Sequence, residues 1–245
     1  MRAGVLRLGA VLLGAVFALP VAAQPGDAGQ RATFLGSLNL QDDALVLRDA
    51  LYQAFSQTDP EATPDERYER AGRFAFFLVA NGIDALDVLR LAEGGVDVLH
   101  AITANERPLA EQSLLADLVI VADVLAPEAD TADGYDGGVR VRVVDVVKGD
   151  VPADTISVRQ QRRRDVPFVI GARYLLLVSN GIYRYGLHRR GTEAAVPEAE
   201  RTHRFSIYRQ YLMDGEAVVW SGYSAEDTAR ALDEVRAVDA ILRRE

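Results

Sequence analysis

Two clusters of basic side chains in the middle of the chain have the clearest potential for chemistry. The first surrounds an expected loop tip, and the second lies with two tyrosines on the connection that follows it. Guanidinium forks bind phosphate and carboxylate through paired hydrogen bonds, and tyrosine rings can stack on a sugar or a base. In a small antiparallel barrel, the two tips can lie close together. The candidate binding residues are Arg162, Arg163, Arg164, Tyr183, Tyr185, Arg189 and Arg190, with Arg159, Arg184 and His188 beside them.

The charge distribution leaves two interpretations of these clusters open. Residues 136–190 carry 11 basic and 5 acidic side chains, a net charge of +6, inside a chain whose net charge is −9. In one interpretation the arginines bind an external anion, such as lipopolysaccharide, a wall polymer or an acidic protein. In the other, the acidic N-terminal helices dock on the basic face, because charge complementarity sets orientation within a chain as readily as between chains.

The patterns that identify common enzymes and metal proteins are missing. His100, His188 and His203 lie in three different segments, without the helical spacing of a zinc site. The chain has no cysteine, which excludes a thiol nucleophile and a Cys-ligated metal. Nucleophile-elbow, phosphate-loop and dinucleotide motifs are absent. We therefore expect a non-enzymatic binding protein with no catalytic residue, metal or cofactor.

Acidic side chains keep one enzymatic alternative open. Asp and Glu number 36, and a catalytic pair forms in space rather than along the sequence, so the alternative is a hydrolase that uses such a pair. A calcium loop is not expected at residues 59–66, since the required glycine and ligand order are missing. Nucleic acid is a poor candidate partner for an acidic, exported protein, although OB barrels can bind strands. The expected partner is an unknown protein or an anionic envelope polymer.

The first 23 residues predict a secretory signal peptide. Arg2 and Arg7 precede an apolar stretch at residues 8–19, which Pro20 ends. Small residues at 21–23 provide a cleavage site before Gln24. Later stretches are too short or too polar to span a membrane. Frequent Ala and Arg are typical of bacterial GC-rich genomes, so we expect an exported protein in the periplasm or the medium.

Composition and periodicity predict an α+β fold. Its centre is a small antiparallel β-barrel, which the resemblance described below makes OB-like, with an N-terminal helical segment and a C-terminal helix packed on it. The expected parts are a signal peptide at 1–23, a flexible mature N-terminus at 24–33, a helical segment at 34–107, the barrel at 108–223 and the C-terminal helix at 224–245.

Helix signals are strongest in the first half of the chain. Residues after Asp42 or Asp43 place Leu47, Leu51, Ala54 and Phe55 on one face. The next helix starts at a capping box formed by Thr63 and Glu66, with Pro64 at its first position, and stops at Asn81-Gly82. A third helix is expected at 84–93, a short one at 108–116, and a last one after Ser224 with the stripe Ala229, Leu232, Val235, Val238 and Leu242.

Runs of β-branched residues between Asp, Gly and Pro predict the strands. The two strongest runs, 118–124 and 139–150, are expected to pair. In the second run Arg140 and Arg142 face water, and a slip of the alternation at Val143-Val144 predicts a β-bulge. Further strands are expected at 155–159, 174–179, 204–213 and 217–220, and barrel core positions at Ile120, Val141, Ile156 and Leu176.

Residues 180–187 predict a hairpin. Asn180-Gly181 is a favoured two-residue turn, and residues 183–187 would form the returning strand. This arrangement places Arg184, Tyr185 and the basic residues after them on an exposed tip.

The central segment resembles the netrin-like, or tissue-inhibitor-of-metalloproteinase-like, OB-fold barrel of bacterial exported proteins. The resemblance rests on an Ala-Asp-Leu-Val phrase at 116–124, a Val-rich strand ending in Lys148-Gly149-Asp150, and the Gly-x-x-Tyr-Leu-Leu motif at 171–176. Ala122 stands where the family usually has glycine. The inhibitor branch grips zinc through an N-terminal cysteine, which this chain lacks, so the resemblance implies the fold and not that mechanism.

Export is directly testable. We expect the mature protein from the native host to begin near Gln24, because the small residues before it suit signal peptidase. Terminal sequencing of the purified protein measures this, with fractionation to locate it. Intact residues 1–23 on a protein that pellets with membranes would refute the prediction.

Overall fold

The chain forms two compact units, residues 1–106 and 107–245. The computed structural model describes residues 41–96, 98, 108–129, 132–160, 167–219 and 223–243. The expected signal peptide, the mature N-terminus, Trp220 and the candidate residues Arg162, Arg163 and Arg164 lie outside these ranges. Within the described ranges, no helix is both long and apolar enough to cross a bilayer.

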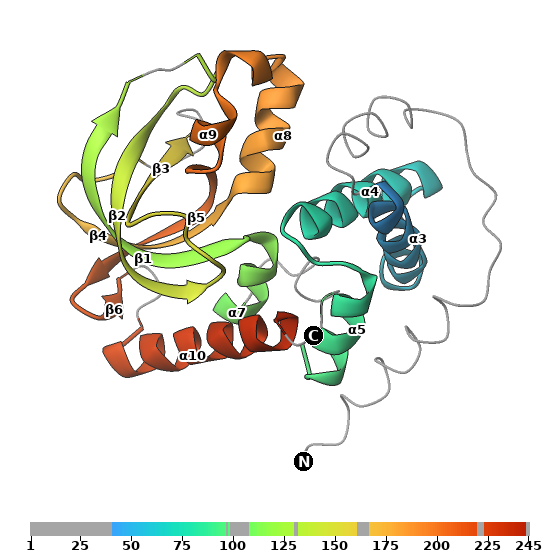
Figure 1. Ribbon diagram of the computed structural model, residues 1–245. Helices are drawn as coiled ribbons and strands as arrows, with labels where there is room; N and C mark the ends of the chain where they lie inside the picture. The colour runs from blue at the N-terminus through green and yellow to red at the C-terminus, as the bar shows by residue number, and fades with distance from the viewer. Residues whose placement is uncertain are drawn as a thin grey trace. The chain divides into compact units, whose positions relative to one another are not determined.

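The described part of the first unit is helical, as the sequence predicts. It contains α3 (Gln41–Thr58), α4 (Pro64–Ala80) and α5 (Ala85–Glu93), and α3 packs along α4 (Figure 1). The predicted apolar face of α3 is buried, with Phe55 fully enclosed. On α4, Ala71, Ala75 and Leu78 are also fully buried. The 3.6-residue period of the sequence therefore located the packed faces correctly.

The start of α4 confirms the predicted capping box. The Glu66 N–H donates to Thr63 Oγ1 at 3.3 Å, and the Thr63 N–H donates to Glu66 Oε2 at 2.9 Å. Pro64 occupies the first helical position, where its missing N–H leaves no helical bond unmade. The hydrogen bonds from Thr63 lower the pKa of Glu66. A similar box between Asp84 and Asp87 begins α5.

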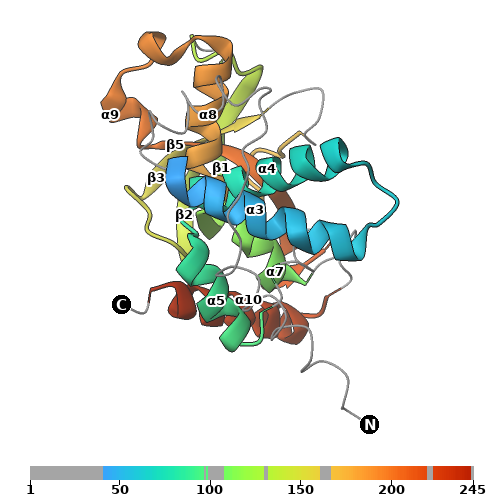
Figure 2. The same cartoon turned by 90° about the vertical axis from the view of Figure 1, so that its right-hand side faces the viewer.

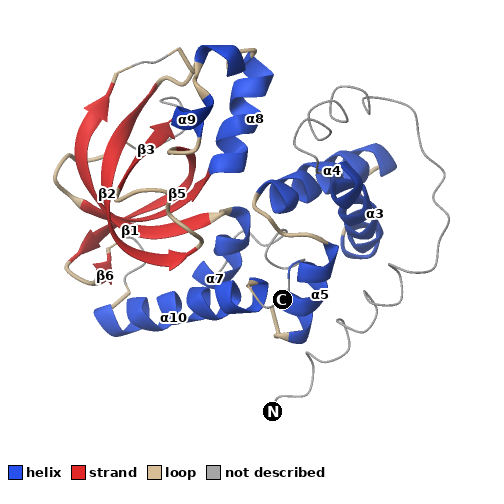
Figure 3. Cartoon of the chain, viewed as in Figure 1, coloured by secondary structure: helices blue, strands red, loops and turns tan. Residues whose placement is uncertain are grey.

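The second unit is built on a six-stranded sheet, so the protein is α+β (Figure 3). Along the sheet the order is β3-β2-β1-β4-β5-β6, with neighbouring strands antiparallel. In addition, β3 pairs in parallel with β5 over Ser157–Arg159 and Arg204–Ser206. The strands are β1 (Leu118–Glu128), β2 (Gly137–Lys148), β3 (Thr155–Gln160), β4 (Arg173–Ser179), β5 (Arg204–Asp214) and β6 (Ala217–Val218).

Alternation along the strands creates two apolar clusters on opposite faces of the sheet. On β1, Leu118 and Ile120 belong to one cluster, and Val119 and Val121 belong to the other. The first contains all four predicted core positions, Ile120, Val141, Ile156 and Leu176, each at most 1% exposed. The second is covered by α10 (Ala225–Leu242), which buries Leu232 and Val235 there.

The pairing of β1 with β2 confirms the predicted bulge. Val121 lies opposite Asp145 and Ala122 opposite Val143, so Val144 has no partner across the ladder. A second shift separates the pairs Val124–Val141 and Ala126–Arg140 and leaves Leu125 of β1 without a partner. Each bulge bends its strand and redirects the side chain at the extra residue.

The predicted hairpin at Asn180-Gly181 is wrong, because these residues begin a helix, α8 (Asn180–Arg190). Ser179 Oγ accepts the Ile182 N–H at 3.0 Å, and Asp117 Oδ2 accepts the Asn180 N–H at 2.9 Å. These acceptors satisfy amides of the first turn and favour a helix over a two-residue turn. The helix ends at Gly191, whose φ of +66° suits glycine. Figure 2 shows α8 and the short α9 (Glu198–Arg201) beside β5.

The remaining helices need one correction. The predicted short helix consists of α7 (Leu109–Gln112) and the 3₁₀ turn η1 (Ser113–Leu115), and a further turn, η2 (Glu193–Ala195), follows α8. On α10, Ala229 was expected in the apolar stripe, but it is exposed. Thr228 is buried instead, because its Oγ1 accepts the Val218 N–H at 3.1 Å. The predicted stripe positions Leu232, Val235 and Val238 are buried.

Ile120→Asp should prevent the second unit from folding, because it places an unpaired carboxylate at a fully buried position. Val144→Asp is the matched control on the neighbouring strand, since Val144 is 46% exposed. Thermal unfolding followed by circular dichroism compares the two proteins. A soluble, cooperatively melting Ile120→Asp protein would contradict the assignment of this face to the core.

Candidate functional site

The described residues of the predicted binding set differ in solvent exposure and in the contacts that they make. Tyr183 is fully buried, which removes it from any surface that a ligand could reach. Tyr185 is half-buried, and the Arg189 guanidinium lies 6.0 Å from its ring centroid. Arg190 is stacked on Tyr135, with its guanidinium 4.2 Å from the ring centroid. The exposed part of the predicted set is thus the C-terminal end of α8.

Tyr183 belongs to a buried ionic cluster around Asp133, on the connection between β1 and β2. Arg159 Nη2 donates to Asp133 Oδ1 at 3.2 Å, and Arg159 Nε lies 3.0 Å from Oδ2. Arg204 Nη1 and the Tyr183 hydroxyl donate to Oδ2 at 3.1 and 3.3 Å. Burial and the Asp133 charge raise the pKa of Tyr183 to about 12, so the hydroxyl keeps the proton that it donates. We call Asp133, Arg159, Tyr183 and Arg204 the Asp133 cluster.

Asp133 and Arg159 have no solvent exposure, so their contact is structural. Breaking a buried ion pair leaves an uncompensated charge and typically costs about 3–5 kcal/mol. The neighbouring Tyr135 hydroxyl shares a hydrogen bond of 2.6 Å with Ser206 Oγ. Gly186 allows this tyrosine to approach α8, since a Cβ at that position would lie 2.3 Å from its hydroxyl oxygen. The connection between β1 and β2 is therefore tied to β3, β5 and α8.

Glu128 and Asp133 form a pair of carboxylates in largely buried surroundings, but a guanidinium joins them. Glu128 Oε2 accepts from Arg159 Nη1 at 3.3 Å and also from Ser157 Oγ. Arg140 Nε lies 3.6 Å from the other Glu128 oxygen. The carboxylates of Glu128 and Asp133 are thus both engaged by Arg159 within the protein. This arrangement matches an ion-pair network.

Several arginines of the basic segment at 136–190 have partners within their own unit. Ion pairs join Arg142 and Arg173 to Asp123, and Arg184 to Glu198 at 2.6 Å. These ion pairs neutralise part of the net charge of +6 that the segment carries. The predicted docking of the acidic N-terminal helices on this face remains a prediction.

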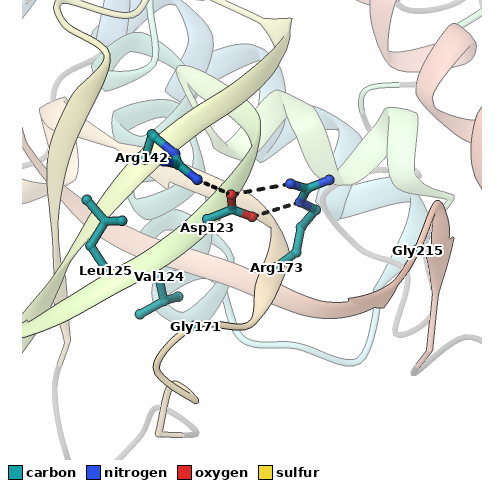
Figure 4. A pocket seen from close by; sticks show the side chains of 7 residues that line it. All are labelled: Asp123, Val124, Leu125, Arg142, Gly171, Arg173 and Gly215. Carbon is teal, nitrogen blue, oxygen red and sulfur yellow. Dashed lines mark hydrogen bonds and ion pairs between the residues drawn. The ribbon is translucent and has the colours of Figure 1, made fainter.

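A surface hollow of about 400 Å³ lies near one end of the sheet and is open to solvent (Figure 4). It is lined by Asp123, Val124, Leu125, Arg142, Gly171, Arg173 and Gly215. These residues come from β1, β2, β4 and the turn before it, and the turn after β5. The hollow thus combines cationic groups, one carboxylate and apolar surface.

The charged groups of the hollow form a row across three strands. Asp123 of β1 lies opposite Arg142 of β2 and Arg173 of β4, so all three side chains project from the same face. Arg173 Nε donates to Asp123 Oδ1 at 2.8 Å, and Arg142 Nη2 donates to Oδ2 at 2.9 Å. The hydrogen bonds from Arg173 and Arg142 lower the pKa of Asp123. We call these three residues the arginine row.

The arginine row leaves guanidinium surface accessible. The side chains of Arg142 and Arg173 are 60% and 43% exposed, whereas that of Asp123 is 17% exposed. One half-buried carboxylate therefore orients two guanidiniums, and the three charges sum to +1. Sequence analysis correctly placed Arg142 on the solvent side, but it did not select Asp123 or Arg173. The alternation of strands 118–124 and 173–179 was the signal that could have found them.

A second enclosed charge lies at the end of β2. Lys148 is 3% exposed, and its Nζ donates to Ser113 O and Ala116 O, both at 2.6 Å. Burial lowers the pKa of Lys148 to about 8, and the charges of Asp117 and Asp239 act in the opposite direction. Burial also raises the pKa of Asp117 to about 6, although amides of α8 donate to it. This lysine joins β2 to the segment before β1.

Among the described residues, no group of three or more histidine, aspartate and glutamate side chains could hold a metal ion. A scan against protein-family models finds no matching family, and searches of curated proteins and of solved structures find no match.

Lys148→Met should remove a pH dependence of stability. A lysine whose folded pKa is about 8 instead of 10.5 contributes stability that is present above pH 10.5 and is lost as pH falls through 8. Between pH 7.5 and 9.5, the free energy of unfolding of the wild type should rise by about 2 kcal/mol relative to the variant. Asp117 acts in the opposite sense at lower pH, where stability is lost as pH rises through about 6.

Urea unfolding of both proteins at several pH values measures this difference. Arg236→Met is the control, because it removes an exposed charge on α10 and arginine side chains do not titrate in this range. A constant difference between wild type and Lys148→Met from pH 7.5 to 9.5 would show that the lysine is not desolvated.

Proposed function

We propose that the protein is an exported, non-enzymatic binding module that recognises an anionic partner through its second unit. The observation that carries this proposal is the composition of the hollow. Guanidiniums stay protonated in proteins, so Arg142 and Arg173 can bind an anion but cannot act as bases. Asp123 is held ionised between them, with a lowered pKa. The chemistry that this surface offers is therefore recognition.

The electrostatic field of the arginine row affects a ligand in the hollow more than the negative net charge of the whole chain does. At physiological ionic strength the Debye length is about 8 Å, so distant exposed carboxylates are largely screened from a ligand in the hollow. A ligand anion in contact with an exposed guanidinium gains a charge-assisted hydrogen bond, and two arginines can share one anion. The carboxylate of Asp123 fixes both before the ligand arrives, which lowers the entropy lost on binding.

We further propose that the second unit is an OB-like barrel of the netrin-like type. The strand pairing supports this proposal, since β1 pairs with β2 and β4, and β5 pairs with β4 and β3. Five strands are thereby linked in a ring, as in an OB fold. Export to the periplasm or medium belongs to the same proposal and is supported by the apolar sequence before Gln24.

The hydrolase alternative has less support from the geometry. Glu128 and Asp133 come closest to a buried carboxylate pair, but both contact Arg159, and neither lines the hollow. A hydrolytic site would have to be formed elsewhere in the chain.

Ligand-dependent stabilisation of the mature chain tests the proposed function. The panel contains a heparin oligosaccharide, lipopolysaccharide, acidic peptides and peptides with a free C-terminal carboxylate. We expect at least one anion to raise the melting temperature, because a ligand at a hundredfold excess over Kd stabilises by about 2.7 kcal/mol. The shift should decrease with salt. If no anion shifts the wild-type melting temperature at low salt, the proposed function is wrong.

Two variants locate the binding surface. The row variant combines Arg142→Gln with Arg173→Gln, and it should lose the shift while melting close to wild type in the absence of ligand. The tip variant changes Arg163, Arg164, Arg189 and Arg190 to Ser, and it should keep the shift. The reverse result would move recognition to the sequence-predicted tips and away from the hollow.

A further inference from the structure

We infer that the hollow is a docking site for the C-terminus of a partner protein chain, with a free carboxylate on the arginine row and an aliphatic last side chain on Leu125. This inference rests on the proposed function and names the class of partner. A chain terminus carries one carboxylate directly beside one side chain. The hollow presents the complementary pair, with cations on β2 and β4 next to an exposed leucine on β1.

Leu125, at a bulge of β1, provides the apolar half of the site. Leu125 has no partner on β2, and its side chain is 41% exposed beside the charged row. Figure 4 shows Leu125 on the same side of the hollow as Arg142. Bulges of this kind often occur next to functional sites. The exposed Val169 and Ile170 precede Gly171 and extend the apolar surface along the turn.

Two glycines leave the backbone at the edge of the hollow uncovered. Gly171 and Gly215 have φ angles of +81° and +58°, and a Cβ built on either would meet nothing within 4 Å. These conformations favour glycine, and the absence of a side chain allows another backbone to approach closely. An extended chain end can therefore reach the row across this edge.

The shape of the hollow favours the end of a longer chain over a free small molecule. Pockets for small ligands typically enclose about 70–90% of the ligand surface. A hollow of about 400 Å³ that is open to solvent encloses much less. A protein terminus needs only its last residue enclosed, because the remainder of the partner contributes contacts outside the hollow.

The charges around the hollow favour a single carboxylate over a polyanion. The arginine row carries a net charge of +1, and the exposed carboxylates Asp214 and Glu216 flank Gly215. A ligand with one negative charge can bind the arginine row without approaching Asp214 or Glu216. A polymer with regularly spaced anions would place further charges near them, and like charges at an interface are unfavourable.

Fluorescence anisotropy with labelled hexapeptides tests the inference on the mature chain. Each peptide ends in leucine or in glycine, with either a free carboxylate or an amide. We expect Kd on the order of 0.1 mM for the carboxylate form, which corresponds to a small transient contact. Amidation should weaken binding by about tenfold, because it removes the charge-assisted hydrogen bonds.

Single variants assign the contacts. Arg142→Gln and Arg173→Gln should each raise Kd by about fivefold, whereas Arg140→Gln should change it by less than about twofold. Arg140 is the matched control, because it lies two residues away on β2, is equally exposed at 60% and does not line the hollow. Leu125→Ser should remove the preference for a terminal leucine over a terminal glycine.

Equal binding of the free and amidated peptides would overturn the inference, and so would equal losses in Arg140→Gln and Arg142→Gln. If no peptide binds but a polyanion still stabilises the protein in a salt-dependent manner, the C-terminus inference is wrong and the proposed function stands. If neither binds, both are wrong.

Discussion

The buried contact between Asp133 and Arg159 is the constraint on which the second unit depends. A carboxylate without solvent exposure stays ionised only when its cations are in place, and here they come from β3 and β5. The Tyr183 hydroxyl adds a donor from α8, and Thr192 Oγ1 bonds the Asp133 carbonyl at 2.9 Å. If one of these cations or donors were missing, the buried charge at Asp133 would be left uncompensated. The connection, two strands and the helix must therefore assemble together.

Arginine serves two purposes in this unit, and solvent exposure decides between them. Arg159 is enclosed, so its donors are used within the protein and contribute to the specificity of the fold. Arg142 and Arg173 make similar contacts with Asp123 but lie in high dielectric, where an exposed pair contributes about 0–1 kcal/mol. Such pairs add little to stability. Under the proposed function, their orientation by a shared carboxylate serves recognition.

Local sequence patterns predicted most helices and strands, but they did not predict which charged side chains contact one another. The valine-rich run of β2 and the capping box at Thr63 depend on neighbours within a few residues, and both are confirmed. The Asn180-Gly181 turn was wrong because distant Asp117, 63 residues earlier, accepts the first amide of α8. Asp133 meets Arg159 and Arg204 across separations of 26 and 71 residues. No periodicity in the sequence records such pairings, which arise from the sheet topology.

The enclosure of Lys148 limits which amines of the protein can react with an amine-directed reagent. It is the one lysine in the chain, and its Nζ lies between two carbonyl oxygens with almost no access to solvent. Amine-directed reagents act on accessible, unprotonated amines, so the native fold shields this side chain from acylation. The α-amino group is then the remaining amine for a dye or a surface linker. A protein labelled in this way carries its tag at one defined end, with every arginine of the hollow unmodified.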